Sequence, residues 1–379
     1  MAGLTAEFAA YIRQTCQYDN DLTDPRKQPR IALGTIVSSI MFLPLSGASS
    51  LLSIDQQLRL PSVRKYFGGG VSDTHMVRVL KELNLDELRA MNYRISTADA
   101  FTYQLGEKRL HIGIVDGSVM AGQYVCCLQL VRNREQRVIL DLEPYENRGK
   151  ELPASKRLLD RAGSLLPDVF LNLIMADGLY VTQYHFNQCL QRGCDVLVKT
   201  KEKDLLIIKD ADGCFDHYQD YADTIEHVTG TDAERNKTFE IFRLGNFPMA
   251  GVKKLLNIAR ITETDIHTGE SETYYVVTTR DDLVALEMRE LSYLRWSIEN
   301  IGFKLLNSLC HSKHGYLKQK AACLNLLFLL ITGFNTLLLF LTSHRSECRQ
   351  LFPGMKSTIK FLARTLAASL FATRIMPRI

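Results

Sequence analysis

The sequence predicts an α/β fold in which a mixed sheet is flanked by helices, and three observations support that prediction. Between about residues 111 and 203, apolar runs of strand length alternate with segments whose apolar residues recur at helical spacing. Strand-like, turn-rich sequence continues to about residue 280. Helical periodicity dominates before and after this stretch, so we expect helices to enclose a sheet-forming middle.

The composition is that of a globular protein. The chain has 379 residues, 46% of them hydrophobic and 23% charged, which suits two or three domains. A net charge of +4 permits nucleic-acid binding without requiring it. The nine cysteines form no CxxC pair, and the N-terminus lacks the pattern of a signal peptide. We therefore expect a cytoplasmic protein with reduced thiols.

Two long uncharged runs could be buried helices or membrane spans. Residues 31–54 contain a proline and two glycines, which favours two buried helices joined by a turn. Residues 321–343 are long enough to cross a bilayer, but Asn325 and Asn335 interrupt the run. We favour a buried core helix here and expect no membrane partner; a membrane anchor is the alternative.

Local patterns define the elements of the first half of the chain. Residues 1–105 have helical periodicity, and Ser72 in VSDTHMVRVLKEL is expected to cap a helix, with His75 at the third position of the capping box. From residue 111 the predicted order is strand, strand, strand, helix, strand, helix and strand, with the second helix ending at Gly193. The seven segments are HIGIVDGS, QYVCCLQLV, QRVILDLEPY, ELPASKRLLDRAGSLL, VFLNLIMADGLY, VTQYHFNQCLQRG and CDVLVKTK.

Residues 204–280 are predicted to be rich in strands and turns. The segments LLIIKDADGCF, KTFEIFRLG, NIARITET and TYYVVTTR have the apolar, β-branched character of strands. The pieces ADG and HTGES are expected to form hairpin turns between them. Helical periodicity returns in DDLVALEMRELSYLRWSIENIGFKLLNSL, and a basic stretch then leads into the long apolar helix.

Two aspartates share one sequence context. Asp116 in IVDGS and Asp177 in IMADGLY each follow an apolar strand and precede a glycine. We expect both to lie at strand ends, where a sheet meets solvent and carboxylates can hold a divalent metal. The alternative is that each Asp-Gly pair simply makes a turn.

Glu299 lies at the edge of an apolar helical stripe, with Arg295 one turn earlier on the same shoulder. An arginine before a glutamate at this spacing is the poorer orientation, and such pairs contribute only about 0.2–0.5 kcal/mol. A partly buried carboxylate needs a partner or a metal to offset its desolvation, so Glu299 is a candidate metal ligand that Arg295 could orient. The stripe consists of Leu291, Leu294, Ile298, Ile301, Leu305 and Leu309.

Three separated carboxylates suit a hard cation. Oxygen ligands in an incomplete protein shell favour Mg²⁺ or Mn²⁺, with water and phosphate completing the coordination. Two ions about 4 Å apart would serve an in-line phosphoryl transfer. We therefore predict two ions held by Asp116, Asp177 and Glu299.

The motifs VDGS, ADGLY followed by CDVLVKTK, and RWSIENIGF together resemble those of DDE transposases from bacterial insertion sequences. The similarity covers roughly residues 24–345 and is to the group with a β-strand insertion between the second Asp and the Glu. It implies an RNase H-like catalytic core, a mixed sheet with flanking helices. The implied division is a helical N-terminal region with probable DNA-end contacts at 1–105, the catalytic core at 106–203 and 281–345, the β-rich insertion at 204–280, and a C-terminal helical tail at 346–379.

The resemblance also implies an activity. Asp116, Asp177 and Glu299 would be the catalytic residues of a metal-dependent enzyme that cleaves double-stranded DNA at element ends. The freed 3′-hydroxyl would then attack target DNA within a homodimeric synaptic complex, in the nucleoid of a bacterial cell. An RNase H-like DNA nuclease and a domesticated, non-catalytic DNA-binding relative are the alternatives.

The helix signature of that group, Tyr-x-x-Arg-x-x-x-Glu-x6-Lys, is matched in part. Arg295 and Glu299 match it, whereas Ser292 stands at the tyrosine position and Leu306 at the lysine position. The remaining residues resemble a variant written W-x-I-E-N-x-G-F.

Basic and aromatic residues near these motifs are the candidate DNA contacts. Trp296 could stack on a displaced base, which contributes about 1–3 kcal/mol where it occurs, or could pack in the core. The candidate DNA-binding residues are Arg295, Trp296, Lys199, Lys201, Lys313, Lys318 and Lys320. Further candidates for DNA or metal contacts are Lys203, His311, His314, Arg26, Lys27 and Arg30.

Overall fold

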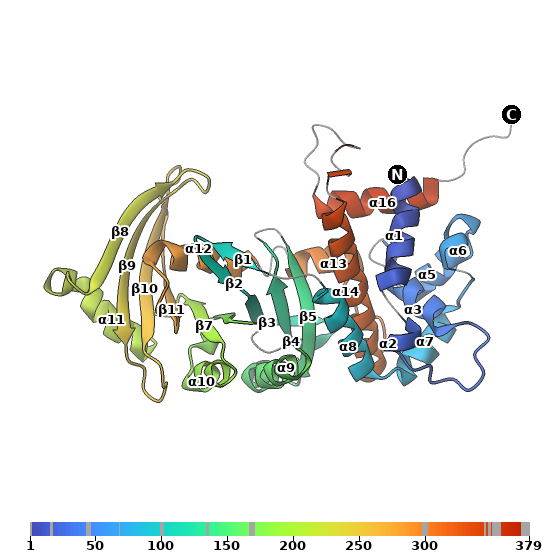
Figure 1. The fold of residues 1–379 in the computed structure, drawn as a ribbon, viewed down its shortest axis with the longest axis horizontal. Helices are drawn as coiled ribbons and strands as arrows, with labels where there is room; N and C mark the ends of the chain where they lie inside the picture. The colour runs from blue at the N-terminus through green and yellow to red at the C-terminus, as the bar shows by residue number, and fades with distance from the viewer. Residues whose placement is uncertain are drawn as a thin grey trace.

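The computed structural model is a mixed α/β protein with one large sheet and a helical region at one end (Figure 1). The N-terminal helices lie at the opposite end of the molecule from the strands of residues 225–278. The structure describes residues 2–15, 18–42, 47–67, 69–98, 102–133, 136–166, 171–297, 302–344, 346–347, 350 and 358–372.

The first hundred residues are mainly helical, as predicted. The Ser72 side chain accepts a hydrogen bond from the backbone N–H of His75, so the predicted N-cap is confirmed. A small hairpin of β1 (Tyr103–Leu105) and β2 (Lys108–Leu110) follows, and its first strand lies inside the region predicted to be helical. The helices are α1 (Ala2–Thr15), α2 (Tyr18–Asp21), α3 (Leu33–Met41), α5 (Leu51–Leu58), α6 (Pro61–Phe67), α7 (Asp73–Glu82) and α8 (Leu85–Ser96).

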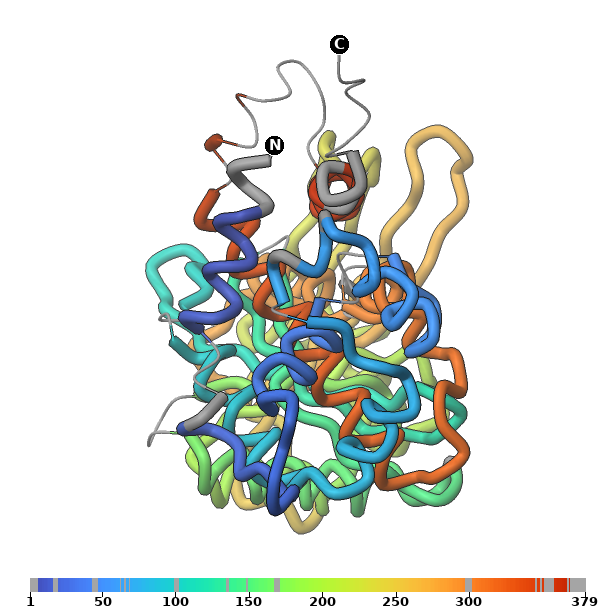
Figure 2. Tube along the Cα trace, turned by 90° about the vertical axis from the view of Figure 1, so that its right-hand side faces the viewer, coloured from blue at the N-terminus to red at the C-terminus, as the bar shows by residue number. Residues whose placement is uncertain are grey.

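Helix α14 (Lys320–Ser343) is the central helix of this region. It runs between the N-terminal helices and the sheet and contacts α3, α7 and α8 (Figures 1 and 2). Its length and composition would allow it to cross a membrane, but its apolar window is 100% buried inside the protein. The predicted core helix is therefore confirmed. Close packing requires Gly333, where a Cβ atom would lie 2.1 Å from the Met41 carbonyl oxygen of α3.

The asparagines of α14 satisfy backbone groups of neighbouring elements. The Asn325 amide donates to the carbonyls of Leu80 and Leu83, which are orphan acceptors at the C-terminal end of α7. Asn335 both donates to the carbonyl and accepts from the N–H of Ile139, in the sheet-edge strand β5 (Arg137–Tyr145). The polar residues that interrupt the apolar run are thus hydrogen-bonded inside the core.

The sheet contains nine strands in the order β5-β4-β3-β6-β7-β11-β10-β9-β8. The predicted succession from residue 111 is confirmed, with α9 (Glu151–Leu165) before β6 and α10 (Gln183–Gln191) before β7. Strands β3, β4 and β5 are antiparallel, whereas β3, β6 and β7 are parallel. The remaining bounds are β3 (Ile112–Met120), β4 (Gln123–Val131), β6 (Leu173–Asp177), β7 (Asp195–Thr200), β8 (Ile225–Asp232), β9 (Lys237–Phe247), β10 (Leu256–Asp265) and β11 (Ser271–Thr278).

The two faces of the sheet pack against different helices. Alternate residues of β6 belong to separate apolar clusters, because successive side chains of a strand point to opposite faces. Ile174 faces the cluster that includes α9 and α14, whereas Leu173 and Met175 face α12 (Ala285–Ser297). In the central strands, side chains on the same face of the sheet as Met175 therefore point toward α12.

The segment 204–280 extends the core sheet. Strand β11 pairs with β7, with Tyr275 opposite Thr200, so the four inserted strands continue the same hydrogen-bonded ladder. The prediction of a strand at LLIIKDADGCF is wrong, because residues 206–216 form helix α11 (Leu206–Asp216). Its buried residues Ile207, Ile208, Ala211 and Phe215 recur at helical spacing, and Gly213 lies within the helix instead of a turn.

The structure describes two parts of the helix predicted after residue 281. Leu291, Leu294 and Leu309 are buried as predicted, in α12 and in α13 (Lys304–Cys310). A π-helical turn at Gly302 precedes α13, and a Cβ atom there would lie 2.4 Å from the Gln129 amide oxygen. Ile298, Glu299 and Ile301 lie outside the described residues. In the C-terminal tail, α16 (Ile359–Ala372) packs against α1, α6 and α14.

Candidate functional site

The sheet brings Asp116 and Asp177 together. Strands β3 and β6 are parallel neighbours whose paired residues end at Ile114 and Met175, two positions before Asp116 and Asp177. Asp116 is two residues beyond Ile114, and Asp177 is two residues beyond Met175. Both aspartates therefore lie on the face of the sheet that packs against α12. Residues distant in sequence thus form a pair of carboxylates on one face of the sheet.

The context predicted for Asp116 is wrong in one respect. Strand β3 does not end at this residue but continues to Met120, since the antiparallel partner β4 also continues and pairs Cys127 with Asp116. The turn interpretation of Asp116-Gly117 is therefore excluded. Asp177 does end β6, where its Oδ1 atom accepts a hydrogen bond from the Leu179 N–H and caps a short 3₁₀ turn.

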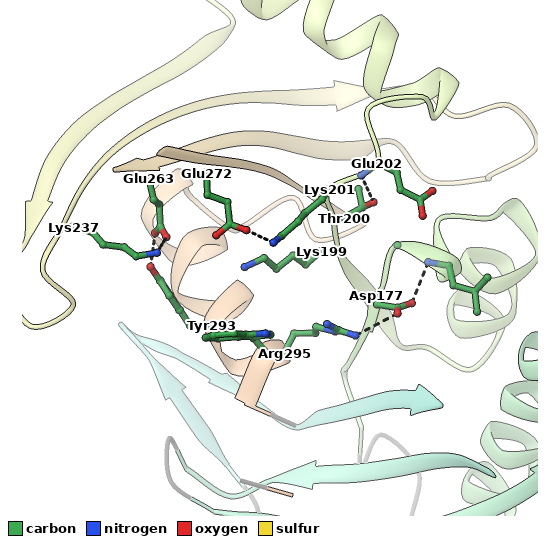
Figure 3. A pocket seen from close by; sticks show the side chains of 13 residues that line it. Asp177, Lys199, Thr200, Lys201, Glu202, Lys237, Glu263, Glu272, Tyr293 and Arg295 are labelled. Carbon is green, nitrogen blue, oxygen red and sulfur yellow. Dashed lines mark hydrogen bonds and ion pairs between the residues drawn. The ribbon is translucent and has the colours of Figure 1, made fainter. Parts of the chain in front are cut away.

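Arg295 of α12 lies against both aspartates. Its Nη2 atom is 3.6 Å from Asp116 Oδ1. The same atom is 3.4 Å from Asp177 Oδ2 (Figure 3). The side chains of Arg295 and Asp116 are each 11% exposed, and that of Asp177 is 36% exposed. The two carboxylate oxygens lie at most 7.0 Å apart, the sum of 3.6 Å and 3.4 Å. The predicted third ligand, Glu299, lies outside the described residues.

A cleft of about 420 Å³ opens beside Asp177 and Arg295 and is lined by residues of α12, β7 and the strands β9 to β11 (Figure 3). Trp296 lines the cleft with 56% of its surface exposed, so the alternative that it packs in the core is wrong. Asp177, Lys199, Lys201 and Arg295 line the same cleft. The structure therefore groups one aspartate with four of the predicted DNA-binding residues.

The two cleft lysines have different surroundings. Lys199, opposite Asp177 in the β6–β7 register, places its Nζ atom 3.7 Å from the centre of the Tyr274 ring. Burial lowers the pKa of Lys199 to about 8. Lys201 is exposed and forms an ion pair with Glu272.

The other predicted contacts lie outside the cleft. Lys313, Lys318 and Lys320 are exposed on the segment between α13 and the start of α14 and do not line the cleft. His311, His314, Lys203, Lys27 and Arg30 are likewise exposed. Arg26 instead has structural partners, since it hydrogen-bonds Asp24 and the Ile31 carbonyl.

The partial helix signature has a structural counterpart. Ser292 is fully buried and donates to the Tyr274 hydroxyl, whereas its neighbour Tyr293 lines the cleft and donates to Glu263. Leu306 is fully buried, and the nearby Lys304 is exposed. Tyr293 is therefore the tyrosine of this helix that faces the cleft.

An ion-pair network that the sequence did not reveal fixes α12 to the inserted strands. Arg289 donates to Glu263 at 2.7 Å and to Asp232 at 2.9 Å, and Lys237 donates to Glu263 at 2.8 Å. Burial alone would raise the pKa of Asp232, but hydrogen bonds from Arg235 and Arg289 outweigh it and lower the pKa to about 2. No local pattern marks these residues, because the acids lie on strands distant in sequence from Arg289.

A separate group of possible metal ligands lies where α1 meets the end of α14. Single ligand atoms of Glu7, His344 and Glu347 are all within 4.8 Å of one another. Both glutamates are exposed, and exposed acidic groups commonly gather without a metal. This group does not contribute to the cleft.

Comparison with known proteins does not assign the chain to a family. No protein-family model matches the sequence, and no curated protein matches it.

Proposed function

We propose that the protein is a DDE transposase that cuts DNA at the ends of an insertion sequence and joins the 3′-hydroxyl to target DNA. One observation carries the proposal. Asp116 and Asp177, the two aspartates of the resemblance, lie on adjacent parallel strands and share the Arg295 guanidinium. Arg295 is itself a residue of the helix signature.

The strand order supports an RNase H-like core. Taken in chain order, the five core strands occupy the positions third, second, first, fourth and fifth across the sheet. The second strand is antiparallel to the first, whereas the fourth and fifth strands are parallel to the first. An RNase H-like fold places its first carboxylate on the first strand and its second on the fourth, which correspond to β3 and β6.

The donor atoms suit Mg²⁺ or Mn²⁺. Asp116 and Asp177 offer hard carboxylate oxygens, and Asp177 Oδ2 is directed into the site because Oδ1 is held by the Leu179 N–H. Glu299 would complete the ligand set, a role that rests on the sequence motif. Two bound ions would supply Lewis acidity at the attacking and leaving oxygens of phosphoryl transfer.

The cleft suits double-stranded DNA that has been locally opened. Lys199 and Lys201 would bind backbone phosphates, and Trp296 offers an exposed ring on which a base can stack. Lys313, Lys318 and Lys320 would form a second contact surface for element-end or target DNA. A homodimer would hold two element ends together.

Leu306 favours a second candidate. A fully buried leucine stands where the resemblance expects a phosphate-binding lysine. A nuclease that cuts without strand transfer needs no lysine to bind a phosphate of the cleaved end. Strand transfer into a supercoiled plasmid distinguishes the two candidates, because only the transposase gives joined products.

Cleavage of DNA that carries the element's own ends tests the proposal. Asp116→Asn, Asp177→Asn and Glu299→Gln should each reduce Mg²⁺-dependent cleavage by at least about 100-fold and leave DNA binding largely intact. Glu202→Gln is the matched control, since Glu202 is an exposed acid that lines the same cleft and lies outside the predicted ligand set. Wild-type cleavage rates in the aspartate variants would refute the assignment.

A further inference from the structure

We infer that Arg295 is an internal counter-ion that holds the metal site in the absence of metal and is displaced when metal binds. The inference rests on the proposed function, because it requires Asp116 and Asp177 to be metal ligands. It concerns what the site does before it is loaded.

The position of the guanidinium is the first argument. A single nitrogen, Nη2, lies 3.6 Å from Asp116 Oδ1 and 3.4 Å from Asp177 Oδ2, the two carboxylates that would hold a metal ion. Two carboxylates this close repel one another, and one guanidinium halves their charge. Arg295 and a bridging cation would compete for the same oxygens and would also repel each other.

The contact between Arg295 and the two aspartates is long for an ion pair. Its distances of 3.4 Å and 3.6 Å exceed the roughly 2.7–2.9 Å of a charge-assisted hydrogen bond. Other arginines of the chain reach that length, for example Arg289 to Glu263 at 2.7 Å and Arg280 to Asp282 at 2.7 Å. The attraction between Arg295 and the aspartates is therefore mainly electrostatic. A divalent cation carries twice the charge and would attract the carboxylates more strongly.

The remaining contacts of the guanidinium are also few. Within the part of the chain that the structure describes, the buried Nε atom of Arg295 has no hydrogen-bond partner. Arg295 lines the cleft together with Lys199 (Figure 3), and Trp296 also lines it. A guanidinium displaced from the aspartates thus has an adjacent space lined by candidate DNA contacts, where a phosphate would satisfy it.

Direct binding of Mn²⁺, followed by the electron paramagnetic resonance of the free ion, tests the inference without any reaction. Arg295→Gln should bind Mn²⁺ about tenfold more tightly than the wild type, because the ion no longer displaces a cation. The metal-free variant should also melt at a lower temperature than the metal-free wild type, because the attraction between Arg295 and the aspartates is lost. Mn²⁺ should then raise its melting temperature by more than it raises that of the wild type. Asp116→Asn should abolish the binding and thereby identify the site.

Two further variants complete the design. Lys201→Gln removes one positive charge from the same cleft. Lys201 pairs with Glu272, so the Mn²⁺ affinity of this variant should stay within about twofold of the wild type. Should Arg295→Gln not fold, Arg295→Lys tests the same contact. It keeps the charge but loses the planar group, and about threefold tighter binding is expected.

The outcomes separate the two proposals. Unchanged or weaker Mn²⁺ affinity in the Arg295 variants, or equal tightening in Lys201→Gln, overturns the counter-ion inference. The transposase proposal then survives, provided that binding still depends on Asp116. If no variant and no wild-type protein binds Mn²⁺ in an Asp116-dependent manner, both proposals are overturned.

Discussion

Asn335 is the most informative single position for stability. Strand β5 is an edge of the nine-stranded sheet, so its outward backbone groups have no neighbouring strand. Asn335 accepts from the Ile139 N–H at 3.1 Å and donates to the Ile139 carbonyl at 2.7 Å. It also donates to Asn92 and Ser96 of α8, at 3.0 Å and 2.9 Å. One fully buried amide therefore joins α14, α8 and the sheet edge.

Asn335→Leu keeps the number and branching of the non-hydrogen side-chain atoms and removes these bonds. The Ile139 carbonyl retains Asn92 as a donor, so the buried Ile139 N–H is the main group left unpaired. An orphaned buried donor costs about 1–3 kcal/mol, and each lost hydrogen bond about 1 kcal/mol. We expect the free energy of unfolding to fall by about 2–4 kcal/mol.

Urea unfolding followed by circular dichroism measures this change as a shift of the midpoint at constant slope. Thr336→Val is the matched control: Thr336 is also buried in α14, but its hydroxyl donates only to Thr332 of the same helix. Its loss should cost less than about 1 kcal/mol. If Asn335→Leu were as stable as the wild type, the hydrogen bonds to the sheet edge would not contribute as argued.

Two further predictions concern the α12 network and the cleft. The pKa of Asp232 is lowered to about 2, so its contribution of about 1 kcal/mol, after allowance for solvent screening, is present above pH 4 and lost between pH 4 and pH 2. The stability difference between wild type and Asp232→Asn should shrink over that range in urea titrations; a constant difference would contradict the pKa. Trp296→Ala should weaken binding of single-stranded DNA about five- to 100-fold in fluorescence anisotropy, with little change in melting temperature, because the ring is 56% exposed. Unchanged affinity would remove Trp296 from the proposed interface.

Local patterns predicted most of the core elements but failed at α11. The apolar run that begins α11 is short, and such runs fit a strand and a helix equally well. Asp212-Gly213 resembles a turn, yet Asp212 accepts hydrogen bonds from Arg260 and Tyr275 of the adjacent strands. These contacts across the fold hold the segment as a helix on the sheet, and no local sequence pattern contains them.

The candidate site was predicted in its residues but not in its contacts. Asp116 and Asp177 could be named from an apolar run followed by an Asp-Gly pair, and Arg295 from a helix signature. The sequence suggested that Arg295 would orient Glu299, whereas the structure places its Nη2 atom within 3.6 Å of both aspartates. The difference arises because helical spacing reports neighbours on the same helix and not the strands on which the helix packs.

The sequence by itself determined the alternation of strands and helices in the core, the capping of α7 and the chemical identity of the candidate ligands. Each of these depends on residues within a few positions of one another. Only the tertiary structure decided that β3 and β6 are neighbours, that α14 is buried, and that Arg295 faces the aspartates. Strand adjacency and helix docking are set by burial and hydrogen bonding between distant segments, which leave no periodic trace along the chain.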